Sequence, residues 1–107
     1  MILFFLTLLS LSPLKTLDDC ISRKTVEFAP AREAVDVTVE AAMAACIVEQ
    51  ANYRAEIQRG LKLSSPNLSL SQSKEVEKVV FDSGVNGARH RALVSLITER
   101  AKNAPNQ

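Results

Sequence analysis

Apolar residues between Ala31 and Leu63 return every three or four positions, which is the spacing of one face of a helix. The set comprises Val35, Val39, Ala42, Met43, Cys46, Ile47, Tyr53, Ile57 and Leu61. The pattern predicts one long helix over this range, roughly 45 Å in length at 1.5 Å per residue. A helix of that length needs another long helix, or a partner, to cover its apolar face.

The middle of this segment, Ala41 to Val48, is apolar nearly all round, because Ala44 and Ala45 widen the stripe. A helix that is apolar on every side is normally buried. We therefore expect this part to be buried on more than one side.

A second apolar set follows between Lys74 and Lys102 and predicts a second long helix, antiparallel to the first. Its members are Val76, Val79, Val80, Phe81, Val85, Ala88, Ala92, Leu93, Leu96, Ile97 and Ala101. Gly84 and Gly87 lie inside this range, and each glycine costs a helix about 1 kcal/mol relative to alanine. One kinked helix is the preferred interpretation, and two helices joined by a turn at 82–87 are the alternative.

The connection between the two helices, residues 64–73, is rich in serine and also contains Pro66 and Asn67. Ser69 or Ser71 can cap the following helix, and Gln72 stands three residues after Ser69, as in a capping box. We expect Leu68 and Leu70 to fold back onto the end of the hairpin.

A short N-terminal helix is predicted for residues 16–28. Thr16 and Asp19 have the spacing of a capping box, and Leu17, Cys20 and Ile21 share one face. Pro30 is suited to the first position of the long helix that follows.

Residues 1–14 carry no charge and consist mainly of Leu, Ile and Phe. This run is shorter than the roughly 20 residues that cross a bilayer and similar in length to the apolar region of a secretory signal. However, no Lys or Arg precedes it and no clean cleavage site follows it. A cleaved signal is preferred, with a retained membrane tether or a buried N-terminal helix as alternatives. The chain therefore divides into a leader (1–16), a helical domain (17–103) and a disordered tail (104–107).

Two cysteines in a short chain behind an apolar leader favour a disulfide formed in an oxidising compartment. Closing the loop between Cys20 and Cys46 would stabilise the fold by roughly 3 to 4 kcal/mol. The bridge requires residues 23–30 to be partly unwound, or the short helix to cross steeply, because Cys46 lies about 24 Å along its helix from Pro30. The alternative is two reduced thiols that serve as small core side chains.

The net charge of +1 argues against a general polyanion binder, but the charges are unevenly placed. Residues 18–56 hold eight acids and four bases, a sum of −4, whereas residues 59–102 hold eight bases and four acids, a sum of +4. The preferred interpretation is that the two halves attract each other as arms of a hairpin. The alternative is a basic half that meets an acidic partner.

Candidate chemistry is sparse, and we expect no catalytic centre, no cofactor and no metal site. His90 stands between two arginines, where a solvated imidazole is favoured over a catalytic or ligand role. Asp36 and Glu40 are one turn apart and could act as an acid and base pair, but a solvated face is preferred. Nucleic-acid binding is not expected, because no aromatic residues interleave the basic set. That set is Arg89, Arg91, Arg100 and Lys102.

The spacing Cys20-x25-Cys46, with the alanine-rich run Ala41 to Cys46 ahead of the second cysteine, resembles small exported α-helical proteins of proteobacteria. The resemblance covers about Leu17 to Arg59. It implies an all-α fold and export, and it implies no activity.

Together these features predict an all-α protein in which a short helix is stapled by Cys20 and Cys46 to a long helix paired antiparallel with a third. The expected function is that of an exported, periplasmic or secreted protein that binds an unknown protein partner or supports an envelope structure. A membrane-associated protein is the first alternative, with residues 1–14 as an anchor and the basic third helix near acidic lipid. An enzyme that uses Glu40 or His90 is the second.

Overall fold

The structure, a computed structural model, describes residues 2–102, with side chains from Pro13 onward. It confirms the all-α fold, and the described residues contain no strand. The helices are α1 (Ile2–Phe28), the 3-10 turn η1 (Ala29–Ala31), α2 (Val35–Ala45), α3 (Ile47–Ser64) and α4 (Leu70–Lys102). The predicted tail, residues 104–107, lies outside the described residues.

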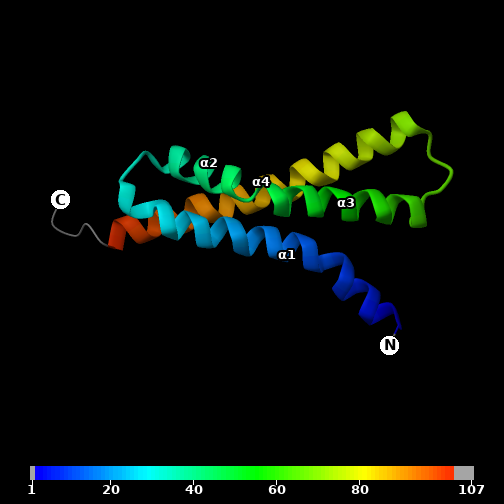
Figure 1. Cartoon of the computed structure of the whole chain (residues 1–107), viewed down its shortest axis with the longest axis horizontal. Coiled ribbons are helices and arrows are strands. Elements are labelled where there is room, and N and C mark those ends of the chain that lie inside the picture. Colours follow the sequence, from blue (N-terminus) through cyan, green and yellow to red (C-terminus); the bar gives the residue numbers. More distant parts are fainter. Residues whose placement is uncertain (1, 103–107) are drawn as a thin grey trace.

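The predicted antiparallel hairpin is present and is formed by α3 and α4 (Figure 1). α4 is long enough to run back past α3 and to pack against α1 and α2 as well. The molecule is elongated, with principal extents of 59, 34 and 18 Å. One end therefore contains the C-terminal part of α1, α2 and the C-terminal half of α4, while the tip of the α3–α4 hairpin lies at the other end, on the side toward which the N-terminal part of α1 extends (Figure 1).

The prediction that the first helix begins at Thr16 is wrong. α1 starts at Ile2 and passes through Pro13 and Thr16 without interruption. The uncharged leader is rich in leucine, a strong helix former, so the helix runs on past the cap that Thr16 offers. Cleavage of the leader stays a prediction, since a continuous helix does not bear on it.

The prediction of one helix from Ala31 to Leu63 is also wrong. The helix is broken at Cys46, whose φ and ψ of −106° and 32° separate α2 from α3. Pro30 lies in the 3-10 turn η1 rather than at the start of α2, which begins only at Val35. α1 remains helical to Phe28, so the unwinding expected over residues 23–30 occurs instead between η1 and α2, where Arg32 adopts a left-handed conformation with φ 59°.

The core lies where α1, α2 and α4 meet and continues between α3 and α4. Its side chains are Leu17, Cys20, Ile21, Val39, Ala42, Met43, Cys46, Tyr53, Phe81, Val85, Ala88, Ala92 and Leu96. Alanines at the contacts between the helices allow the backbones to approach closely. Among the described side chains, the largest that are almost completely buried are Leu17, Ile21, Val39 and Cys46, which belong to α1, α2 and their junction with α3.

The expectation that Ala41 to Val48 is buried on more than one side is wrong. Ala41, Ala44 and Ala45 are exposed, and Ile47 and Val48 are each 63 % exposed. The inner side of this segment packs against α1 and α4, and no described element covers its outer side.

α4 is a single helix through Gly84 and Gly87, which excludes a turn at 82–87. It begins after the predicted capping box, which is confirmed: the Gln72 backbone N–H donates to Ser69 Oγ (3.1 Å), and the Ser69 N–H donates to Gln72 Oε1 (3.0 Å). Leu70 does not fold back onto the hairpin as expected, because it is 72 % exposed.

Candidate functional site

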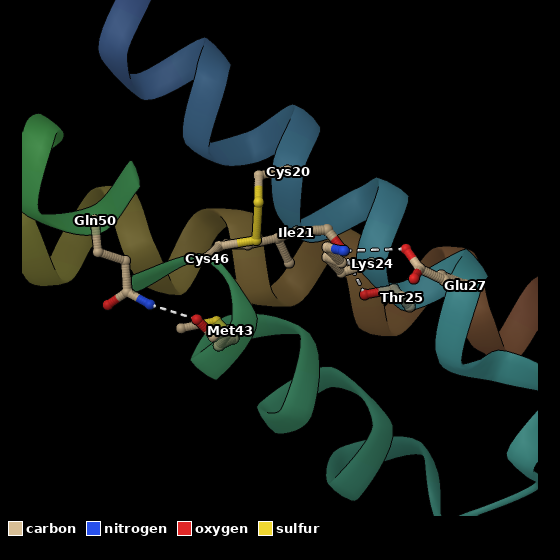
Figure 2. Close-up of a disulfide and its surroundings, with 8 residues drawn as sticks. All are labelled: Cys20, Ile21, Lys24, Thr25, Glu27, Met43, Cys46 and Gln50. Atoms are coloured by element: carbon tan, nitrogen blue, oxygen red, sulfur yellow. Dashed lines mark hydrogen bonds and ion pairs between the residues drawn. A yellow bond between two sulfur atoms is a disulfide. The ribbon is translucent and has the colours of Figure 1, made fainter. Parts of the chain in front are cut away.

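The disulfide between Cys20 and Cys46 joins α1 to the junction of α2 and α3 (Figure 2). The Cα atoms lie 6.1 Å apart, and both side chains are buried. The predicted staple is thus present, and the alternative of two free thiols is excluded. Such a bond persists in an oxidising compartment, so the fold indicates a non-cytoplasmic location.

The break at Cys46 is stabilised by hydrogen bonds to Met43. The backbone N–H of Cys46 and the side-chain amide of Gln50 both donate to the Met43 carbonyl oxygen, at 3.0 and 2.8 Å. Gln50 thereby satisfies an oxygen that the end of α2 would leave without a helical partner (Figure 2). The junction is a fixed corner, held by a covalent bond on one side and these two hydrogen bonds on the other.

Glu49 is the one carboxylate that approaches the two cysteine sulfurs closely enough to complete a three-residue cluster. Because the sulfurs are bonded to each other, they carry no thiolate that could bind a cation. The cluster therefore forms no metal site in the oxidised protein.

Basic residues of α4 contact acidic residues of the N-terminal half. Arg89 Nε lies 2.8 Å from Glu40 Oε1, and Arg91 Nε lies 3.1 Å from Asp18 Oδ1. The attraction expected between the two halves of the chain is confirmed by these pairs. Exposed ion pairs contribute at most about 1 kcal/mol each, so they orient the helices more than they stabilise them.

Arg100 anchors the end of α4 to the connection between α1 and α2. Its Nη1 donates to the Glu33 carbonyl oxygen at 2.6 Å, and Nη2 lies 3.5 Å from both the Ala29 carbonyl oxygen and Thr38 Oγ1. Three of the four arginine and lysine side chains considered for nucleic acid are thus engaged within the protein. His90 and Asp36 are both exposed.

Tyr53 links the two arms of the hairpin. Its hydroxyl donates to the Val80 carbonyl oxygen at 3.3 Å, and its ring stacks on Phe81 with 5.7 Å between centroids. Gly84 makes this contact possible, since a Cβ there would overlap the Tyr53 hydroxyl and lie 2.8 Å from its ring. Burial raises the pKa of the Tyr53 hydroxyl above its ordinary value of 10.0.

A groove of about 630 Å³ lies between the C-terminal ends of α1 and α4. Its walls include Val26, Ala29 and Leu96, with Arg32 and Glu99 among its polar members. A smaller hollow of about 330 Å³ lies beside it, between the end of α1 and the start of α2, and is lined by Phe28, Val37 and Ala41 among others. Both hollows are open to solvent. Each is lined by apolar and charged side chains together, and the described lining of neither contains a cluster of reactive groups.

A further surface without a covering element among the described residues is the outer face of α2 and α3, which we define by six exposed residues. They are Val37, Ala41, Ala44, Val48, Ala51 and Ala55. Their spacing is four and three residues within α2 and three and four within α3, as on the contact face of a helix, and the break at Cys46 separates the two halves. None of the six is polar, although the face opposite the core of a surface helix is normally polar.

α4 also carries exposed valines, but they do not form a continuous apolar seam. Val76, Val79 and Val80 lie near the hairpin tip, whereas Val94 and Ile97 lie near the other end. Ser83 and His90 interrupt the face between these two groups. The outer face of α2 and α3 is therefore the better candidate for a contact with another molecule.

Comparisons with protein-family models, with curated proteins and with solved structures found no match to this chain. None of the described helices has an apolar stretch long enough, and free enough of charge, to cross a membrane. The functional argument therefore rests on the geometry alone.

Sequence reasoning placed Cys20 and Cys46 correctly but missed the outer face as a surface. Ala41 to Val48 is apolar nearly all round, and this pattern predicts burial on more than one side without saying whether the fold or a partner covers it. What could not be seen from the sequence is that α1 and α4 pack against only one side of this segment.

Proposed function

We propose that this chain is an exported helical protein, periplasmic or secreted, that acts by binding another protein through the outer face of α2 and α3. The single observation that carries the proposal is that six exposed apolar residues line a face of α2 and α3 that no described element covers. Apolar faces of this kind are typical of surfaces that are covered by a partner.

Export is supported by the disulfide and by the uncharged leader, residues 1–14. Among the α1 side chains that the structure describes, from Pro13 onward, Leu17 is the first that is fully buried. Binding rather than catalysis is supported by the arrangement of the described polar side chains, since Glu40 is paired with Arg89 and His90 is exposed without a carboxylate partner.

Two measurements test these points. Intact mass of the protein recovered from its host, before and after reduction, should show a chain without residues 1–14 that gains two mass units on reduction. A full-length chain with free thiols, recovered from the cytoplasm, would contradict export.

The binding part is tested by crosslinking in cells that express the wild type, the Ala44→Glu variant or the Val79→Glu variant. Ala44 lies in the outer face, and Val79 is an equally exposed apolar residue of α4. We expect one crosslinked species in the wild type and in Val79→Glu, and its loss in Ala44→Glu. A wild-type protein that forms no crosslinked species, or one that survives Ala44→Glu, would contradict the proposal.

A further inference from the structure

The six residues of the outer face are placed symmetrically about Cys46. Ala44, Ala41 and Val37 precede it by two, five and nine positions, and Val48, Ala51 and Ala55 follow it by the same intervals. A twofold axis that passes beside Cys46 would therefore superpose the α2 half of the face on the α3 half of a second copy.

This symmetry also matches side-chain size. Antiparallel pairing about such an axis opposes Val37 to Ala55, Ala41 to Ala51 and Ala44 to Val48. Each valine then meets an alanine, so a large residue lies against a small one at these pairs, while Ala41 and Ala51 allow close approach of the helices between them. Parallel pairing would instead oppose each valine to itself.

Charge supports the same orientation. One edge of the face is the edge nearest α4: Glu40 on α2 binds Arg89, and the Arg54 guanidinium on α3 lies 4.0 Å from the centre of the Phe81 ring. Asp36 and Arg54 lie at the two ends of this edge, ten residues before Cys46 and eight after it. Both are exposed.

A twofold axis that lies between the two faces brings like edges together and reverses the helix direction. Asp36 of one copy then lies within about two residues, or roughly 3 Å along the helix, of the position opposite Arg54 of the other. The pair forms twice in the dimer. Parallel pairing would instead bring the edge nearest α4 against the opposite edge of the other copy, so this pair of opposite charges would not form.

The geometry points to a second copy of this chain as the occupant of the outer face, in an antiparallel dimer whose twofold axis passes beside Cys46. The inference rests on the proposed function, because it names the partner that the face binds. The contact is one helical layer wide, so it falls below the area of a permanent assembly, and the dimer dissociates reversibly on dilution. The disulfide sets the angle between α2 and α3 and hence the shape of the surface that each copy presents.

Sedimentation of the oxidised protein, in the form recovered from its host and over roughly 5 to 500 µM, tests the dimer. A monomer–dimer equilibrium is expected for the wild type and for Val79→Glu. Ala44→Glu should weaken association by about tenfold or more, because it places a carboxylate beside the axis in both copies. Circular dichroism that matches the wild type shows that the variant is folded, which is expected at so exposed a position.

The orientation is tested by charge exchange and by crosslinking. Asp36→Arg alone and Arg54→Asp alone should each weaken the dimer by roughly threefold to tenfold, and the double exchange should restore it. A photo-crosslinking residue at position 37 should attach near Ala55 of the other copy. Attachment at residue 37 itself, or no restoration in the double exchange, would overturn the antiparallel arrangement.

Different results would overturn the dimer and the more general function of binding a protein. A wild type that sediments as a monomer at every concentration, yet is crosslinked in cells to a different protein in an Ala44-dependent manner, overturns the dimer and leaves the binding function standing. Association with anionic lipid vesicles that depends on Ala44, without dimerisation, overturns both in favour of a membrane surface. Absence of any contact at this face also overturns both.

Discussion

The two ends of the molecule are stabilised very differently. At the stapled end, α1, α2 and the C-terminal half of α4 surround Leu17, Ile21 and Val39, each completely buried, and the disulfide joins two of the three helices. Toward the hairpin tip α3 packs against α4, and the core finishes at Tyr53 and Phe81.

Beyond that pair the hairpin gains little from burial. Leu63 is 80 % exposed, and Glu77 is buried with its Oε1 atom lacking a hydrogen-bond partner among the described side chains. An unsatisfied buried acceptor costs about 1 to 3 kcal/mol. The comparison teaches that stability in this chain follows the number of helices around the core rather than helix length, and that the tip of the hairpin opens first.

The largest effect is expected from the disulfide. Replacing both Cys20 and Cys46 with alanine should lower the free energy of unfolding by about 3.5 kcal/mol, because the loop closed by the bond constrains the unfolded chain. Denaturant titration of the wild type and the double variant, each with and without a reducing agent, measures the loss. Reductant should affect the wild type alone, and a double variant as stable as the oxidised wild type would contradict the importance of the staple.

Truncation of one leucine at each end compares the packing directly. Leu17→Ala should cost about 3 kcal/mol, because it leaves a cavity among three helices. The same substitution at Leu63 should change stability by less than about 0.5 kcal/mol, because the side chain is mostly in water. Thermal or chemical unfolding of the two variants provides the comparison, and equal losses would remove the distinction between the ends.

The two glycines of α4 should respond in opposite directions to the same substitution. Gly84→Ala displaces the Tyr53 ring and should cost about 1 to 2 kcal/mol, even after the gain in helix propensity. A Cβ at Gly87 would lie 3.4 Å from the Arg91 guanidinium, an ordinary contact, so Gly87→Ala should gain up to about 1 kcal/mol. Two gains would show that Tyr53 is not held against α4.

The smallest effect concerns pH and the same tyrosine. Burial raises the pKa of Tyr53 above its value in the unfolded chain, so the folded state keeps the proton more tightly. This contribution to stability is complete below about pH 10 and is lost as the pH rises through the raised pKa. Tyr53 is the only tyrosine of the chain, so the ultraviolet absorbance of the phenolate reports it alone. Titration at the ordinary pKa would contradict its burial.

Local features of the fold were predictable from the sequence, and features imposed by packing were not. The Ser69 and Gln72 capping box follows from local hydrogen bonding, and the Cys20 to Cys46 bond follows from their compartment and number. The break at Cys46 could not be predicted, because no Gly or Pro lies there. It arises from the contact with α1 and the Gln50 hydrogen bond. Gly84 suggested a weak point in α4, whereas its role is to admit the ring of Tyr53.

The outer face of α2 and α3 also depends on packing, which the sequence does not reveal. The nearly all-round apolar character of Ala41 to Val48 predicted burial on more than one side. That prediction was wrong, because α1 and α4 cover only one side of this segment. A single sequence does not distinguish an internal neighbour from a second molecule.

Hydrogen exchange of the backbone amides, resolved along the chain and measured before and after reduction, tests the central claim most directly. The account predicts the strongest protection at the stapled end, in residues 17–25 and 38–46, and rapid exchange at the hairpin tip, in residues 58–75. Reduction should lower the protection of the stapled end by orders of magnitude. Uniform protection along the chain, or protection of the stapled end that survives reduction, would contradict it.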